Sequence, residues 1–166
     1  MKLPWAALLL LFWLNGARAG EHASGSFPMT HTAWGATVVE LSGENTSQAT
    51  AVGVVTQRDA IEYCQRDPGG NHVGAEQGAR KCVNELLAQE SGKRYSIRAD
   101  CPGKTITTSH LGSFVFTGKF EDEGGLPLYP WKNTNTGEHM DGGMMGGGAT
   151  VDAQFGLVCG AFKFWD

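Results

Sequence analysis

The sequence predicts a single small domain of the α+β class, with an N-terminal β-hairpin, then two helices, then a mostly antiparallel sheet stapled by two disulfides. Three observations support this class. Residues with β-forming character precede and follow a middle section whose apolar residues recur at helical spacing, and the chain contains four cysteines. A hydrophobic content of 41% suits a domain with a hydrophobic core.

The first 19 residues have the pattern of a secretory signal peptide. Lys2 precedes an apolar run over residues 3–14, and Ala17-Arg18-Ala19 has small residues at its first and third positions. The apolar run is shorter than the roughly 20 residues that cross a bilayer. We therefore expect cleavage after Ala19, a secreted or periplasmic location, and no membrane anchor in the mature chain.

The mature chain is acidic. Removing residues 1–19 leaves 147 residues with 11 Lys and Arg against 17 Asp and Glu, a net charge of −6. This balance argues against a nucleic-acid surface, which needs clustered basic residues. Residues 20–33 are small and polar, so we expect a flexible leader there and one domain over residues 34–166.

The expected elements begin with a hairpin. Residues 34–41 and 49–55 are rich in β-formers and flank a turn sequence, Ser-Gly-Glu-Asn. Thr56 then has the position of an N-cap, with Asp59 three residues later, and this pattern predicts a helix to about Arg66. A second helix is expected over residues 75–90 because its apolar residues recur every three or four positions.

From residue 93 the pattern changes to β structure. The predicted strands, separated by turns with Pro or Gly, cover residues 94–99, 105–109, 113–120 and 153–165. The last segment is apolar on both faces, which is typical of a covered central strand. Between the last two strands, residues 121–150 are predicted to form a long irregular loop. Irregular stretches of that length are often functional, so we expect this loop to be the functional surface.

The four cysteines, Cys64, Cys82, Cys101 and Cys159, predict two disulfides in an exported protein. Four cysteines allow three connectivities, and the sequence alone does not select one. We favour Cys64–Cys82 because both lie on apolar faces of adjacent predicted helices. We favour Cys101–Cys159 because both would lie on β segments. The alternative of a catalytic thiol needs a free cysteine, which the even count disfavours.

One stretch has the composition of a soft-metal site. His139, Met140, Met144 and Met145 lie close together in a glycine-rich segment, and thioether sulfur with imidazole selects copper(I). The alternative is that the methionines pack as adaptable hydrophobic plugs at the edge of the core. Nearby, residues 126–131 combine prolines and aromatic residues, which we interpret as a lid over the sheet more readily than as a contact surface.

The recognised catalytic motifs are missing. The sequence has no Gly-x-Ser-x-Gly elbow, no His-Glu-x-x-His helix and no complete phosphate-binding loop. The sequence therefore favours a non-catalytic, exported binding module without a cofactor, whose partner is a protein or a small ligand. The alternatives are a periplasmic copper(I)-binding protein and a secreted hydrolase whose site has no recognisable motif. Asn45-Thr46-Ser47 also matches an N-glycosylation acceptor.

Overall fold

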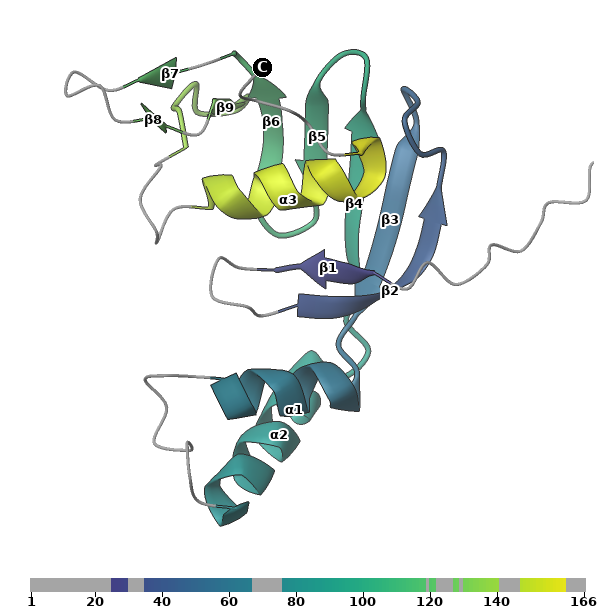
Figure 1. The fold of residues 1–166 in the computed structure, drawn as a ribbon, viewed down its shortest axis with the longest axis vertical. Helices are drawn as coiled ribbons and strands as arrows, with labels where there is room; N and C mark the ends of the chain where they lie inside the picture. The colour runs from purple at the N-terminus through teal and green to yellow at the C-terminus, as the bar shows by residue number, and fades with distance from the viewer. Residues whose placement is uncertain are drawn as a thin grey trace, which may run out of the picture.

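The computed structural model describes residues 25–29, 35–66, 76–118, 120–121, 127–128, 130–140 and 147–160. One face of a seven-stranded antiparallel sheet carries a helix, and two further helices form an arm that projects from the sheet (Figure 1). The predicted α+β class with two disulfides is confirmed. The sheet strands, in spatial order, are β1 (Ser26–Pro28), β2 (Gly35–Ser42), β3 (Ala49–Val54), β4 (Tyr95–Asp100), β5 (Thr105–Thr108), β6 (Gly112–Phe116) and β9 (Trp131–Asn133).

The sheet is a meander in which nearly every strand pairs with its neighbour in sequence. The predicted hairpin is present, with β2 paired to β3 from Thr37–Val54 to Ser42–Thr50. Two strands at the edges of the sheet lie where the sequence predicts no strand. Strand β1 lies within the predicted leader, and β9 lies within the predicted irregular loop, between 121 and 150. That loop also contains β8 (Pro127–Leu128), which pairs with β7 (Phe120–Glu121) in a separate small sheet.

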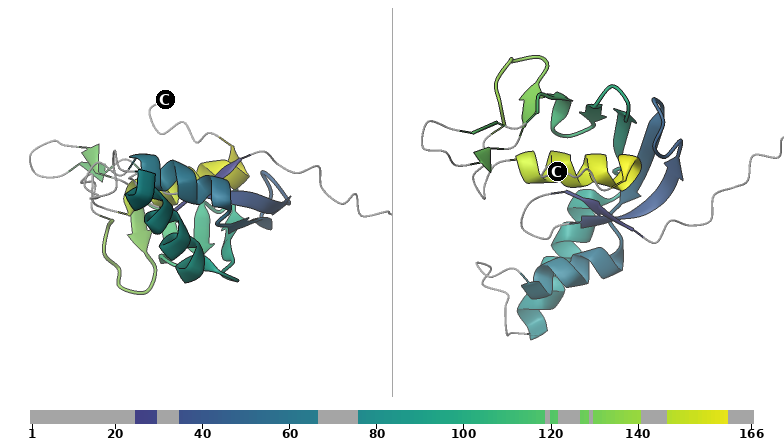
Figure 2. Two further views of the ribbon diagram at one scale, coloured as in Figure 1. Left: turned by 90° about the horizontal axis from the view of Figure 1, so that it is seen from below. Right: turned by 45° about the horizontal axis from the view of Figure 1, so that its top comes forward.

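The core lies on the inner face of the sheet, which we define as the face that packs against α3 (Gly148–Cys159). Alternate strand residues point to this face, because successive side chains in a strand point to opposite sides. The buried set includes Phe27, Ala36, Val38, Ala49, Ala51, Ile97, Ala99, Ile106, Phe114 and Trp131 from the strands, with Val151, Phe155 and Val158 from α3. Helix α3 runs across the strands and joins β1, β3, β4, β5 and β9 into one core (Figures 1 and 2).

The prediction of a strand over residues 153–165 is wrong for residues 153–159, which belong to helix α3; residues 161–166 lie outside the described part of the chain. The physical reason is that a segment with apolar residues on every side fits a covered strand and a buried helix equally well. Here the inner face of a single sheet needs a cover, and a helix supplies one while satisfying its own backbone hydrogen bonds.

The arm consists of α1 (Gln57–Arg66) and α2 (Glu76–Glu90), joined by the disulfide Cys64–Cys82. Both helices and this pairing confirm the prediction. Helix α1 begins with a capping box: the Asp59 amide donates to Thr56 Oγ1 at 3.3 Å, and the Thr56 amide donates to Asp59 Oδ2 at 2.8 Å. Helix α2 ends before Gly92, whose φ of +73° lies in the left-handed region that favours glycine.

Each helix of the arm is tied to the sheet through one carboxylate. Asp59 Oδ2 also accepts the Thr37 amide at 3.1 Å and the Thr37 hydroxyl at 2.9 Å, and Thr37 belongs to β2. Glu90, the last residue of α2, is 8% exposed and accepts hydrogen bonds from Lys93 and from the Tyr95 hydroxyl. Burial and the Glu90 carboxylate together raise the pKa of Tyr95 to about 12. Polar contacts from both helices thus attach the base of the arm to the sheet.

Replacing Asp59 with alanine should lower the free energy of unfolding by about 1–3 kcal/mol. The change removes the carboxylate side of the capping box and leaves the Thr37 and Thr56 donors without their acceptor, while the Thr56 hydroxyl still caps the backbone amide of residue 59. Urea denaturation measures the loss, and Asp59→Asn, which keeps an oxygen acceptor, should lose less. Equal stability of the alanine variant and the native protein would show that the Asp59 carboxylate contributes nothing to stability.

The disulfide Cys101–Cys159 confirms the second predicted pairing but not the geometry proposed for it. Cys159 is the last residue of α3 and Cys101 lies in the turn after β4, so the bond joins a helix to the sheet and not two strands. The β2–β3 turn supports the same helix end, because the Asn45 amide donates to the Val158 carbonyl at 2.9 Å. The C-terminal end of α3 is therefore fixed covalently and by a backbone cap.

Candidate functional site

The residues predicted to bind copper(I) are only partly described. His139 and Met140 are in the structure, and Met144 and Met145 lie outside the described residues. His139 forms a β-bridge with Lys132, and the Met140 amide donates to the Trp131 carbonyl at 2.8 Å. Because successive side chains alternate, His139 shares the outer face with Lys132, while Met140 shares the inner face with Trp131. The structure does not bring these two side chains together.

Met140 packs against the core. It is half-buried beside the core cluster, and a Cβ added at Gly147 would lie 2.8 Å from Met140 Cε. This placement agrees with the plug interpretation for Met140. In the described ranges, no three or more His, Cys, Asp or Glu side chains are grouped so that they would hold a metal ion. Copper binding by the full set of four residues stays a prediction.

Trp131, from the aromatic-proline segment, is part of the core and has no exposed surface. Its ring lies 5.5 Å from that of Phe116 and 5.1 Å from that of Phe155, measured between ring centroids. The indole N–H donates to Asp152 Oδ1 of α3 at 3.4 Å. Trp131 is therefore buried, as the lid interpretation expected, but it belongs to the edge strand β9 of the sheet itself and is not a lid over the sheet.

Asp152 is a carboxylate in a partly apolar setting. Burial raises its pKa to about 6 from an ordinary value of 3.8, and the hydrogen bond from Trp131 opposes part of this shift. A raised pKa in the folded state means that the unfolded chain releases this proton first as the pH rises. The contribution of Asp152 to stability is therefore greatest below about pH 4 and is lost as the pH rises to about 6.

We expect Asp152→Asn to remove most of the loss of stability that Asp152 causes as the pH rises from about 4 to about 6. Thermal unfolding measured at several values between pH 4 and pH 6 should show a shallower decline for Asp152→Asn than for the native protein, since asparagine has no proton to release. Glu138→Gln, at an exposed carboxylate, is the control for the change in charge and should keep the native slope. An unchanged slope in Asp152→Asn would contradict the assignment.

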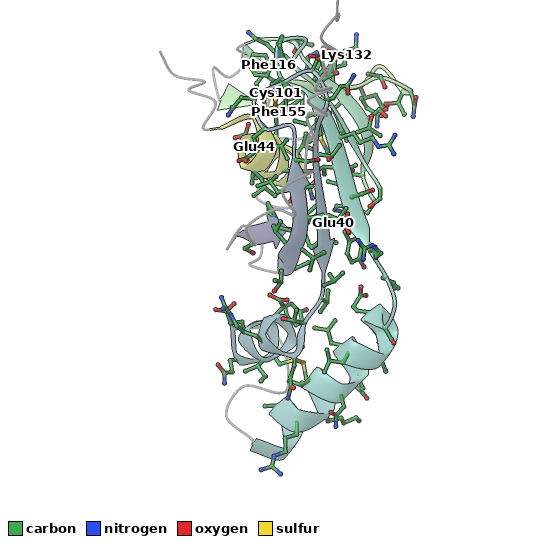
Figure 3. All side chains as sticks on the ribbon, turned by 90° about the vertical axis from the view of Figure 1, so that its right-hand side faces the viewer. Glu40, Glu44, Cys101, Phe116, Lys132 and Phe155 are labelled. Atoms are coloured by element: carbon green, nitrogen blue, oxygen red, sulfur yellow. A yellow bond between two sulfur atoms is a disulfide. The ribbon has the colours of Figure 1, made fainter. Side chains whose placement is uncertain are left out.

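The outer face of the sheet is the face opposite α3, and no described helix covers it (Figure 3). The register places one row of polar side chains across five adjacent strands, from β2 to β6. Each residue of the row pairs with the next: Ser42, Thr50, Arg98, Thr107 and Ser113. Hydroxyl pairs connect both ends of the row, at 2.7 Å between Ser42 and Thr50 and 2.9 Å between Thr107 and Ser113.

A cavity of about 460 Å³ lies at the β2–β3 turn end of this row. We call it the Arg98 cavity. It is lined by Ser42, Ser47, Gln48, Ala49, Thr50, Arg98, Ala99 and Asp100. Strands β2, β3 and β4 hold most of this lining in a fixed ladder register, and the turn supplies Ser47 and Gln48. The lining thus combines three hydroxyls, an amide, a guanidinium and a carboxylate.

The two charged side chains of the Arg98 cavity differ in whether they have a hydrogen-bond partner. One oxygen of Asp100 accepts the Gly103 amide at 2.9 Å. The guanidinium of Arg98 is exposed, and among the described residues it has no hydrogen-bond or ion-pair partner. Arginine carries five N–H donors in a fixed fork and stays charged. This side chain is therefore available to a ligand.

Two other cavities of similar size are less suited to polar recognition. One, of about 400 Å³, lies between α1 and α2 and has the mainly apolar lining Ile61, Cys64, Ala79 and Val83 with polar residues at its rim. The other, of about 420 Å³, lies at the base of the arm. Its cations are already paired, Lys93 with Glu90 and Arg94 with Glu40. The Arg98 cavity is the candidate site.

Sequence reasoning did not identify the Arg98 cavity. Apolar and polar side chains alternate over residues 95–100, which places Ser96, Arg98 and Asp100 on one face of a strand. This pattern could have indicated a polar face around Arg98. That signal does not tell which strands lie on either side, so the hydroxyls of β2 and β3 were not connected to Arg98.

Comparison of the chain with protein-family models, curated proteins and solved structures found no match. Within the described segments, none of the helices has the length and apolar content that crossing a membrane requires.

Proposed function

We propose that this protein is an exported, non-catalytic binding module, and that the Arg98 cavity holds a small polyhydroxylated ligand such as a sugar. The observation that carries the proposal is the convergence of hydroxyl, amide and charged groups in one cavity on a sheet frame. Sugars offer many donors and acceptors in a small volume, and a pocket with several placed polar groups suits them. The signal-like residues 1–19 and the two disulfides support export.

The lining also favours binding over catalysis. The described residues around the cavity include no His, Cys or Lys that would activate one of its hydroxyls. The hydroxyls of Ser42 and Thr50 bond to one another instead, which keeps their positions fixed in the free protein. A fixed polar lining lowers the entropy that is lost when a ligand binds. The copper(I)-binding and hydrolase alternatives stay predictions.

Titration of the isotope-labelled protein with a panel of monosaccharides and short oligosaccharides, followed by amide NMR, tests the proposal. We expect the largest shifts at residues 47–50 and 98–100, which line the cavity. Thr50→Val removes a lining hydroxyl and should weaken binding, while Thr107→Val removes a hydroxyl of the same row outside the cavity and should not. Shifts that concentrate in α1 and α2 would place the binding surface on the arm and contradict the proposal.

A further inference from the structure

The proposed ligand class can be narrowed by the charge of the Arg98 cavity. Hydroxyl and amide groups match the neutral hydroxyls of any sugar and do not select among sugars. Arg98 is the charged donor in the lining, and it has no partner among the described residues. A guanidinium matches the planar oxygen pair of a carboxylate, with two parallel N–H···O bonds. We propose that the ligand is a uronic acid, a sugar with a carboxylate, and that Arg98 binds this carboxylate.

This inference rests on the proposed function. The remaining charges indicate how many anionic groups the ligand carries. Asp100 lies two residues from Arg98 on the same face of β4, and its carboxylate repels anionic groups in general, so only the ligand carboxylate that pairs directly with Arg98 is compensated. The mature chain has a net charge of −6, which also disfavours a dense polyanion. One carboxylate facing Arg98, with hydroxyls facing Ser42, Ser47 and Thr50, fits the lining better than a polysulfated or polyphosphorylated chain.

The lining also indicates how the sugar ring is recognised. Among the described residues, no aromatic side chain lines the Arg98 cavity, so none of them supplies a stacking platform there. Hydrogen bonds and the single charge pair then provide the selectivity between ligands. Such a site binds a ligand much more weakly when the ligand lacks one of the matching groups, because a polar group of the protein then loses its hydrogen-bond partner.

Matched ligand pairs test the inference. Methyl glucuronoside and methyl galacturonoside differ from the neutral methyl glycosides only in the carboxylate at carbon 6, and calorimetry or NMR titration gives the affinities. We expect the acidic member of one pair to bind about tenfold more tightly to the native protein, in keeping with one charge-assisted pair. In Arg98→Gln this preference should disappear, so that the acidic and neutral sugars bind alike.

Two variants and one competitor complete the test. Arg98→Lys keeps the charge without the fork and should retain part of the preference. Arg58→Gln removes an exposed arginine of α1 outside the cavity and should keep the native affinities. Inorganic phosphate should not displace the uronic acid. Displacement by phosphate at similar concentration would mean a general anion site and overturn the inference.

The outcomes separate the inference from the proposed function. Equal binding of acidic and neutral sugars to the native protein, with shifts at the cavity, overturns the uronic acid and leaves the sugar site standing. Absence of binding by every sugar overturns both. Because Arg98 is exposed, Arg98→Gln should fold normally, and its melting temperature, measured alongside the native protein, checks this.

Discussion

Trp131→Ala should lower the free energy of unfolding by about 3–5 kcal/mol, the range for removing a large buried aromatic side chain. Trp131 has no exposed surface and packs against Phe116 of β6 and Phe155 of α3. Its loss leaves a cavity between the sheet edge and the helix that covers the core, and leaves Asp152 without its N–H donor. A domain of this size has roughly 5–15 kcal/mol of stability in total, so this variant should be close to the limit of folding.

Urea denaturation of the native and variant proteins gives the difference. Trp131→Phe is the matched control, because it retains an aromatic ring and removes the indole N–H, and it should lose clearly less stability than the alanine variant. Equal losses in the two variants would assign the effect to the hydrogen bond with Asp152 instead of to packing.

The second large effect is expected from removal of the disulfide Cys101–Cys159. The chain-entropy relation gives about 4 kcal/mol for a bond that closes a loop of this length, and about 3 kcal/mol for Cys64–Cys82. The sequence separations are 58 and 18 residues. The double variant Cys101→Ser/Cys159→Ser also releases the end of α3 that covers the core, so its effect should reach the whole sheet.

Removal of each disulfide should destabilise a different part of the chain. Hydrogen exchange in Cys64→Ser/Cys82→Ser should accelerate in α1 and α2 and change little in β3 to β6, because that bond lies within the arm. In Cys101→Ser/Cys159→Ser it should accelerate in α3 and the core strands. Faster exchange throughout the chain in both double variants would show that the arm and the sheet unfold as one cooperative unit.

Local patterns in the sequence predicted the elements that have local signals. Thr56 and Asp59 marked the start of α1, and the apolar spacing within the two predicted helices placed Cys64 and Cys82 on apolar faces. The β2–β3 hairpin followed in the same way from β-formers on either side of a turn. These signals are short in range, and tertiary packing did not override them.

The remaining elements depend on contacts that a single sequence does not contain. Residues 153–159 are helical in a context where α3 buries the apolar inner face of the sheet. Residues 131–133 form a strand because they pair with β6. The candidate site could not be predicted from the sequence for the same reason. Arg98 and the hydroxyls of Ser42 and Thr50 are brought together by the register of three strands, which only strand order determines.

The position of the arm in the topology has an architectural consequence. Strands β3 and β4 are antiparallel neighbours, paired as far as Gly53 and Tyr95, although the whole arm lies between them in sequence. Antiparallel neighbours need a connection of only two residues. The arm is therefore an insertion into a β-hairpin, closed by its own disulfide, and the paired residues that set the β3–β4 register lie outside it. We expect that such a module can change in length or sequence during evolution or engineering while the register that builds the Arg98 cavity is kept, provided that the acceptors for Thr37 and Tyr95 remain.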